Sequence, residues 1–345
     1  MKIFYSLVFL FCFVTNSAFS QLDTDITGTE ANPASHDGLL SVVFVDLQTK
    51  GESILVIFPN GKTMLIDGGM PSAYPKLESV LKQHGISEID VMIGTHADQD
   101  HIAGLTKVLD DSDFVVKQVL ISYIPSSTLT YRNFLDELSD NGLQSQAVFD
   151  GHIIDVDSSV ATKILSPPIG GIQDGPSASL ANSNSLVTLL EYGNVSFLLT
   201  ADATHTTELW IVQNHPNLDI DIMNGPHHGS KHSSTDAFID HITPQLVIFS
   251  ANLNNEYGHP HQEAVNEYLS RGINHYQTGL EGNIVIKTDG SGCSLILEGQ
   301  PEQPCYSGVQ VVPEFPFVLT ILVGSVFGVV LLSKFKRLQN PILKN

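Results

Sequence analysis

Short apolar runs alternate with amphipathic stretches along most of this chain, and this alternation predicts an α/β fold. Apolar runs of a few residues indicate buried strands, and stretches with a period near 3.6 residues indicate helices. The expected strands are 89–94, 115–122, 162–166, 185–192, 197–202, 220–224, 246–250 and 283–287, and the expected helices are 102–109, 134–143, 206–215 and 263–269. A body of about 260 residues is consistent with a single α/β domain. The alternation by itself would also allow a doubly wound sheet.

Residues 1–20 have the pattern of a secretory signal peptide. Lys2 precedes an apolar run at 3–14, and small residues lead to an expected cleavage site before Gln21. The alternative is an uncleaved membrane anchor. Residues 21–37 are polar and rich in Thr and Asp, which indicates a flexible lead-in to a folded domain at 38–300.

A second apolar segment, 315–333, follows a predicted linker at 301–314. It is long enough as a helix to cross the ~30 Å hydrocarbon layer. The tail at 334–345 is basic, so the positive-inside rule places it in the cytoplasm and the folded domain outside the cell. We therefore expect an exported protein that is anchored in the cytoplasmic membrane. The run from Val312 to Pro316 also resembles a Pro-Glu-Phe sorting signal, which would imply that the tail is removed.

Cysteine usage agrees with export. Cys12 would leave with the signal peptide, so the mature chain would keep Cys293 and Cys305. Two cysteines in an exported protein, beside a stretch rich in Gly and Pro, predict one disulfide.

Four side chains that commonly bind metals occur within six residues, directly after the expected strand 89–94. They are His96, Asp98, Asp100 and His101. Further candidates follow later strands: Asp202 after 197–201, His227 and His228 after 220–224, and His259. Strand ends in α/β proteins meet at one edge, where active sites form. Imidazole and carboxylate ligands suit zinc, manganese or iron, and two ions could share Asp202.

These motifs resemble the metallo-β-lactamase superfamily. The match comprises the run from Thr95 to His101, Leu-Leu-Thr-Ala ending at Asp202, and His-His-Gly-Ser from His227. It is closest to the ComEC-like hydrolases of the competence-protein branch, in which an Asp replaces the second His of the usual HxHxDH signature. The resemblance covers about residues 38–300 and implies a four-layer αββα sandwich.

The resemblance also implies a role for each candidate ligand. His96 and Asp98 would hold a first divalent ion (the first site). Asp100, His101 and His228 would hold a second (the second site), and Asp202 would bridge the two. Zinc is the expected metal, with manganese or iron as alternatives.

One ligand that the superfamily usually has is missing. A further first-site His is expected before the bridging acid, but residues 181–186 contain none, and Asn184 stands near its place. The ComEC-like branch resembles this chain in having Asn-Ser there.

The metals imply a hydrolytic mechanism. Two divalent ions lower the pKa of water and so supply hydroxide, which attacks a phosphorus or carbonyl centre. We predict that Asp100 orients this nucleophile. His259 and His227 are candidates for protonating the leaving group or binding a phosphate oxygen, although either could be structural.

Charge bears on the substrate. Residues 21–310 contain every acidic residue except Glu314 and 11 of the 16 basic ones, which gives a net charge of about −25. Such a domain repels long polyanions, and it has no Lys/Arg-rich stripe. A small phosphodiester or ester is therefore a more suitable substrate than long nucleic acid. The alternatives to a phosphodiesterase are an esterase or lactonase on the same fold, or a non-catalytic surface binding module; oligomeric state is left open.

Overall fold

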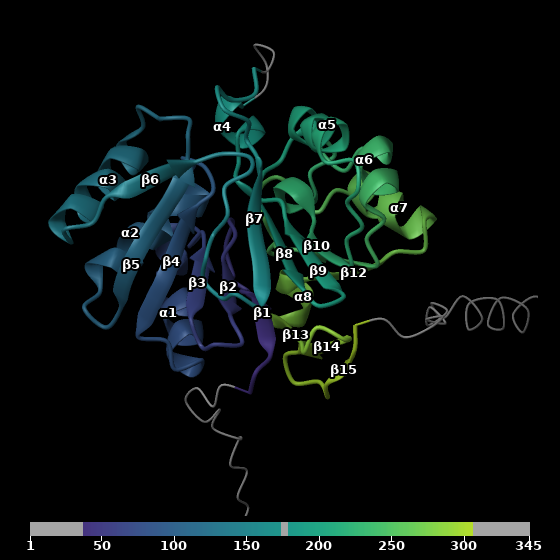
Figure 1. The fold of residues 1–345 in the computed structure, drawn as a ribbon, viewed down its shortest axis with the longest axis horizontal. Coiled ribbons are helices and arrows are strands. Elements are labelled where there is room, and N and C mark those ends of the chain that lie inside the picture. Colours follow the sequence, from purple (N-terminus) through teal and green to yellow (C-terminus); the bar gives the residue numbers. More distant parts are fainter. Residues whose placement is uncertain (1–36, 174–178, 306–345) are drawn as a thin grey trace, which may run out of the picture.

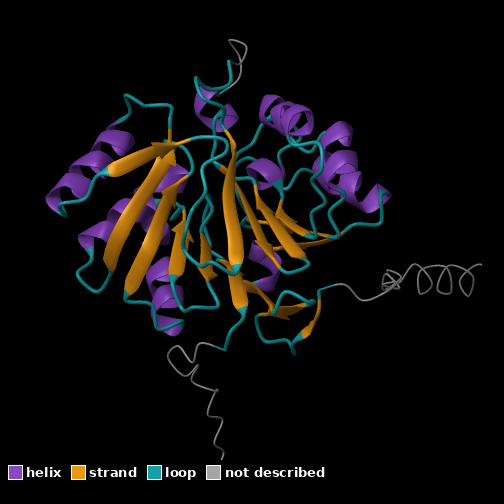
Figure 2. Ribbon diagram, viewed as in Figure 1, coloured by secondary structure: helices purple, strands orange, loops and turns teal. Residues whose placement is uncertain are grey.

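The computed structural model describes residues 37–173 and 179–305, which form two β-sheets with helices outside each (Figure 1). The first sheet has nine strands in the order β15-β14-β13-β1-β2-β3-β4-β5-β6, and the second has six in the order β12-β11-β10-β9-β8-β7. This arrangement confirms the predicted αββα sandwich and not a single doubly wound sheet. Figure 2 shows the strands gathered in the interior and the helices on the two flanks.

The strands of the first sheet are β1 Leu40–Phe44, β2 Ile54–Ile57, β3 Thr63–Ile66, β4 Glu88–Gly94, β5 Val115–Ser122, β6 Ser145–Val148, β13 Ile284–Thr288, β14 Cys293–Leu297 and β15 Gln303–Pro304. Those of the second sheet are β7 Val160–Ser166, β8 Val187–Tyr192, β9 Val195–Leu199, β10 Ile222–Asn224, β11 Leu246–Phe249 and β12 Asn274–Gln277.

The α-helices are α1 Tyr74–Gln83, α2 Gln99–Asp110, α3 Leu129–Asp140, α4 Leu180–Ser183, α5 His205–Asn214, α6 Asp236–Ile242, α7 Gln262–Ser270 and α8 Thr278–Glu281. Two short 3-10 helices, η1 Pro71–Ala73 and η2 Pro226–Gly229, complete the order.

Three hydrophobic cores separate the four layers. The first lies between the sheets and includes Phe44, Phe197 and Ile248. A second packs helices α1 to α3 on the nine-stranded sheet, and a third packs α5 to α7 on the six-stranded sheet. Because both faces of the central strands are covered, β1, β3, β9 and β11 are buried along their whole length. This is why their sequences are mostly apolar, with one Ser or Thr in each of β1, β3 and β9.

The parallel parts of the two sheets determine where chemistry can occur. Strands β3 to β6 are parallel in the first sheet, and β9 to β12 are parallel in the second. The carboxyl ends of parallel neighbours lie at the same edge of a sheet, so the residues that follow them are brought together.

Two expectations need correction. The first helix was expected at 102–109, but α2 begins at Gln99, because the N–H groups of His101 and Ile102 already bond the carbonyl of Asp98. Asp100 and His101 therefore lie in a helix turn and not in a loop. Part of the predicted linker 301–314 is also structured, because β15 pairs with β14.

The predicted disulfide between Cys293 and Cys305 is present and joins β14 to the residue after β15. The signal peptide, lead-in, apolar segment 315–333 and basic tail fall outside the described residues. Within residues 37–173 and 179–305, no helix combines the length and apolar character needed to span a bilayer.

Candidate metal centre

The first half of the centre forms where β4 meets α2. After Gly94 the chain passes through Thr95 and His96 and enters the helix, whose first turn carries Asp100 and His101. Close packing of this turn depends on two glycines: a Cβ on Gly104 would lie 1.8 Å from the carbonyl oxygen of Gly68. The N–H of Gly104 bonds the carbonyl of Gly69 at 2.8 Å. The segment after β3 is thereby held against α2, beneath the candidate ligands.

The second half forms after β9 and β10, where the backbone is strained. Ala201, which precedes Asp202, has φ +46°, and His227 and His228 have φ +50° and +57°. Left-handed conformations of non-glycine residues cost free energy and are concentrated at functional sites. Asp67, at the end of β3, has φ +55° as well. Four strained residues therefore surround one point at the edge of the sheets.

The carboxylate of Asp202 lies between the predicted ligands. Its Oδ1 is 3.3 Å from Nε2 of His101 and 3.3 Å from Nε2 of His228. Its Oδ2 is 3.8 Å from Nε2 of His96. The two oxygens of one carboxylate thus face different histidines, the arrangement required of a bridging ligand.

Two groups of metal-binding atoms result. His96, His101 and Asp202 offer atoms that all lie within 4.8 Å of one another, as do Asp100, His101 and His228. Asp98 belongs to neither group, although its Oδ2 lies 3.7 Å from Nε2 of His96. The structure therefore gathers all three predicted second-site residues in one group, whereas of the predicted first-site pair only His96 belongs to a group.

The buried atoms at this point fit metal ions. Among the described residues, Nε2 of His96, His101 and His228 and Oδ1 of Asp202 are buried without a hydrogen-bond partner. Burying an unpaired polar atom costs free energy unless it coordinates a metal or pairs with another group. Four such atoms converging on one point are explained by coordination of divalent cations.

Groups behind the second-site histidines fix their orientation. Nδ1 of His101 lies 2.6 Å from Oδ2 of Asp67, and Nδ1 of His228 lies 3.0 Å from the carbonyl oxygen of Ser250. A proton held on Nδ1 by these acceptors leaves Nε2 free to bind a metal. Sequence reasoning did not assign Asp67, although its place directly after a buried strand was a usable signal.

At the first site the structure places Asn182, and not Asn184, near Asp202. The amide of Asn182 donates to Oδ2 of Asp202 at 3.0 Å and lies 3.4 Å from Nε2 of His227. The amide of Asn184 instead bonds both the N–H and the carbonyl of Ile172. The prediction that Asn184 stands near the place of the missing histidine is therefore wrong. Asn184 directly follows α4 and bonds Ile172, whereas Asn182 lies beside Asp202.

Burial and mutual charge set the protonation of the centre. Burial lowers the pKa of His96 to about 3. Burial alone would also lower the pKa of His101, but the carboxylates of Asp202 and Asp67 outweigh it and raise that pKa well above its usual value. Conversely, burial opposes ionisation of Asp202, yet His101, His228 and His227 hold its pKa well below the usual range. The carboxylate of Asp202 is therefore ionised.

His227 and His259 border the same centre. Nε2 of His227 lies 3.3 Å from Oδ2 of Asp202, and the ring of His259 lies 5.7 Å from that of His227. Burial lowers the pKa of His227, and burial together with His228 and His227 lowers that of His259 to about 3. A neutral imidazole can donate one hydrogen bond, but it lacks the additional proton that an imidazolium would give to a leaving group.

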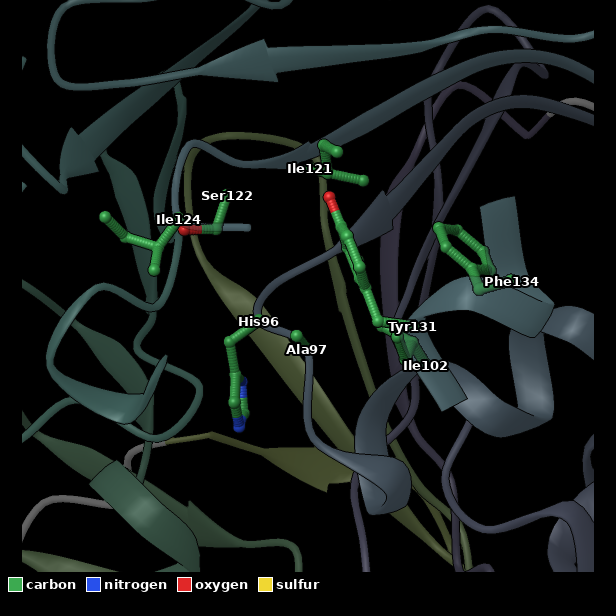
Figure 3. A pocket seen from close by; sticks show the side chains of 9 residues that line it. His96, Ala97, Ile102, Ile121, Ser122, Ile124, Tyr131 and Phe134 are labelled. Atoms are coloured by element: carbon green, nitrogen blue, oxygen red, sulfur yellow. The ribbon is translucent and has the colours of Figure 1, made fainter. Parts of the chain in front are cut away.

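Side chains from β5 and α3 come close to His96. A cavity of about 10 Å³ lies there, which is about the size of one water molecule. Figure 3 shows the Tyr131 side chain reaching toward Ile121, with the ring of His96 directed away from both. This cavity is too small to hold a substrate.

A buried hydrogen bond joins the two sheets next to the centre. The amide of Asn224, at the end of β10, donates to Oε2 of Glu52 at 2.8 Å, and its oxygen accepts from the hydroxyl of Thr200. Burial raises the pKa of Glu52. This contact connects residues 172 positions apart in the sequence and holds the two ligand-bearing edges in register.

Comparison with protein families shows where this arrangement belongs. Residues 49–246, more than half of the chain, match the family model described as the metallo-beta-lactamase superfamily. The chain belongs to this superfamily. It is accordingly a metal-dependent hydrolase, and its ligand groups are those of an enzyme that uses divalent metal ions.

Two curated relatives confirm the resemblance to the competence-protein branch. ComE operon protein 3 of Bacillus subtilis is 29% identical over 252 residues, which is 68% of this chain and 31% of that protein. Recombination protein 2 of Haemophilus influenzae is 26% identical over 250 residues, or 70% of this chain and 28% of that protein. The chain thus spans about a third of the length of these relatives.

Among solved structures, a metal-dependent hydrolase of the beta-lactamase superfamily is similar at 14% identity and a TM-score of 0.45, with 69% of this chain and 95% of that chain covered. A diphosphatase of the PhnP family is similar at 15% identity and a TM-score of 0.42, with 72% and 98% covered.

Proposed function

We propose that this hydrolase is a phosphodiesterase that uses two divalent ions, with zinc as the natural pair. The observation that supports this most directly is the position of Asp202, whose two oxygens face separate histidines. A bridging carboxylate places two cations close enough to act on one phosphate group. Buried imidazoles favour zinc, and the three carboxylates allow manganese or iron as substitutes.

When bound, the ions would lower the pKa of water and neutralise charge on the reacting phosphate. The protein's own residues would do the rest. Asp202 would keep the two sites at a fixed separation, and Asp100, half-buried in the first turn of α2, would orient the attacking water. His227 and His259 would donate hydrogen bonds to phosphate oxygens, which suits their lowered pKa values better than proton donation does.

The proposed substrate is a small phosphodiester. The charge of about −25 over residues 21–310 opposes binding of a long polyanion. A small phosphodiester carries few charges, and two cations at the centre would offset them locally. Hydrolysis of a carbonyl ester would use the same ions, so the two reactions are distinguished by assay.

The proposed location is the outer face of the cytoplasmic membrane. The support is the sequence of the termini: an apolar run after Lys2, and residues 315–333 followed by a basic tail. The disulfide between Cys293 and Cys305 also suits an oxidising compartment.

The test uses the purified full-length chain, its metal content by elemental analysis, and two chromogenic substrates. We expect bound metal and faster hydrolysis of bis(p-nitrophenyl) phosphate than of p-nitrophenyl acetate. Faster ester hydrolysis would indicate the esterase or lactonase alternative. A metal-free protein without activity on either substrate would favour the non-catalytic binding module and reject the proposal.

Two matched pairs of variants locate the activity. Asp100→Asn and His228→Ala should each lose most of it, since both residues belong to the second site. Asp110→Asn, at the other end of α2, and His232→Ala, an exposed neighbour of the same loop, should keep it. Equal activity in all four variants would place the reaction elsewhere.

A further inference from the structure

A row of aromatic rings leads outward from the second site to a lysine. The ring of His259 stacks on that of His228 at 6.2 Å and lies 5.7 Å from that of His227. The ring of Tyr257 stacks on His259 at 5.6 Å, and Nζ of Lys50 lies 5.3 Å from the centre of the Tyr257 ring. The row therefore connects a predicted metal ligand with an ammonium group near the surface.

Backbone contacts fix the position of this lysine. Its neighbour Gly51 has φ +108°, and a Cβ there would lie 2.1 Å from the carbonyl oxygen of Asp100. The loop with Lys50 is therefore pressed against the helix turn that carries a second-site residue. On its other side the amide of Asn252, in the loop that leads to Tyr257, bonds the carbonyl of Gln48 at 3.1 Å. Lys50 is thus held between the metal centre and the Tyr257 loop.

The present partner of Lys50 can be replaced. Nζ forms an ion pair with Glu256 at 2.8 Å, and the Glu256 side chain is 64% exposed. Exposed ion pairs of this kind contribute little to stability, so an incoming anion can take the place of Glu256 at small cost. Tyr257 is 54% exposed, and Nζ of Lys50 lies over its ring. An ammonium group on an aromatic face, beside an otherwise acidic centre, is a suitable site for one anionic group.

The exposure of the surrounding side chains also favours a substrate that extends from the metal centre toward Lys50. The cavity beside His96 has a volume of about 10 Å³, whereas Tyr257 is 54% exposed and the Lys50 side chain 31%. A substrate with its reacting phosphate at the metals can therefore extend along the rings toward Lys50.

We propose that Lys50, seated on Tyr257, binds a second phosphate group of the substrate, separate from the phosphodiester that is hydrolysed. This inference rests on the proposed phosphodiesterase function and names its substrate class: small phosphodiesters that carry a further phosphate. Lys50 is then a specificity-determining residue. Its ammonium group binds as a point charge that does not require a fixed bidentate geometry.

The test compares two substrates that share the scissile bond and the leaving group. They are thymidine 5′-(p-nitrophenyl phosphate) and the same compound with a 3′-phosphate. The metal-loaded full-length protein should show a KM about tenfold lower for the 3′-phosphorylated substrate, the size expected for one hydrogen bond to a charged group. Lys50→Met should raise the KM for the 3′-phosphorylated substrate about tenfold, and it should leave kcat and the KM for the other substrate unchanged. Lys50→Arg should retain most of the preference.

Lys117→Met is the matched control, because the ion pairs of Lys117 with Glu88 and Asp90 lie near the amino-terminal end of β5, at the edge opposite the centre. Equal KM values for both substrates in the wild type, or an equal loss on both in Lys50→Met, would overturn the role of Lys50 and leave the phosphodiesterase function standing. Absence of hydrolysis of either substrate by the metal-loaded wild type would overturn both proposals.

Discussion

The histidines of the proposed second site bond acceptors on the far side of their rings, and the proposed first site has weaker support of this kind. In the second site, His101 bonds the buried carboxylate of Asp67 and His228 bonds the carbonyl of Ser250. An acceptor behind each ring fixes which nitrogen faces the metal and raises the affinity of the ligand. The second site is therefore preorganised before any cation enters.

The first site has weaker support. Nδ1 of His96 lies 3.1 Å from the hydroxyl of Thr95, which itself donates to Asp67, so His96 reaches this carboxylate only through Thr95. The side chain of Asp98 is 44% exposed. Instead of a further histidine, the amide of Asn182 bonds Asp202. Identical ligand types in one motif therefore do not give equal sites, because the groups behind them decide how firmly they are placed.

Removal of the shared ligand should have the largest effect. In Asp202→Asn the side chain keeps its size but loses the charge that faces both sites. Bound metal should fall to less than one ion per chain, and kcat/KM should fall on the order of 10³-fold. Elemental analysis and the chromogenic assay measure the two quantities. Asp155→Asn, an exposed acid on another loop, should match the wild type; if Asp202→Asn also matched it, Asp202 would not be a ligand.

The segment that follows His228 is also bonded to a buried glutamate, Glu208, and this contact affects the stability of the fold. The carboxylate of Glu208 accepts bonds from the N–H groups of Ser234 and Thr235. Burial raises the pKa of Glu208 from 4.5 to about 7, although these two bonds oppose the rise. The folded chain then binds this proton more tightly than the unfolded chain does. Its stabilising contribution is complete below about pH 4.5 and is lost as the pH rises through about 7.

Glu208→Gln removes this titration. The free energy of unfolding of the wild type, relative to that of the variant, should decrease by about 3 kcal/mol as the pH rises from below 4.5 to above 7. Urea unfolding of both proteins at a series of pH values measures the difference. A constant difference, or an increase with pH, would show that Glu208 does not hold a proton in the folded chain.

The supports behind the histidines should contribute unequally. Asp67→Asn weakens the hold on His101 and should reduce metal affinity at the second site by about 10- to 100-fold. Thr95→Val removes the hydroxyl beside His96 and should reduce affinity at the first site by less than about tenfold. Titration with zinc against a competing chelator measures both. A larger loss in Thr95→Val than in Asp67→Asn would reverse the ranking of the two sites.

The alternation of apolar and amphipathic stretches predicted the α/β class, and the resemblance to the superfamily supplied the four-layer arrangement and the candidate ligands. Apolar runs such as 115–122 coincide with strands, and the acids and histidines that follow β4, β9 and β10 meet at one edge because the strands are parallel. Local patterns of this kind follow from residue periodicity. The start of α2 at Gln99 was missed because its first turn is polar and carries the ligands themselves.

The supporting residues could not be predicted in the same way. Asp67 and His101 are 34 positions apart, and tertiary packing, including the close approach of Gly68 to Gly104, brings them into contact. The choice between Asn182 and Asn184 depends on the direction of a single helical turn. Such contacts arise from tertiary packing, which one sequence does not reveal.

Stepwise removal of metal tests the two-site account most directly. The full-length protein, loaded with zinc, is dialysed against increasing concentrations of a chelator, and the ions that remain per chain are counted by elemental analysis. We predict two ions at the start and loss in two separate steps, with Asp98→Asn lacking only the step at the lower chelator concentration. A single bound ion in the wild type, or loss of both ions in one step, would contradict the account.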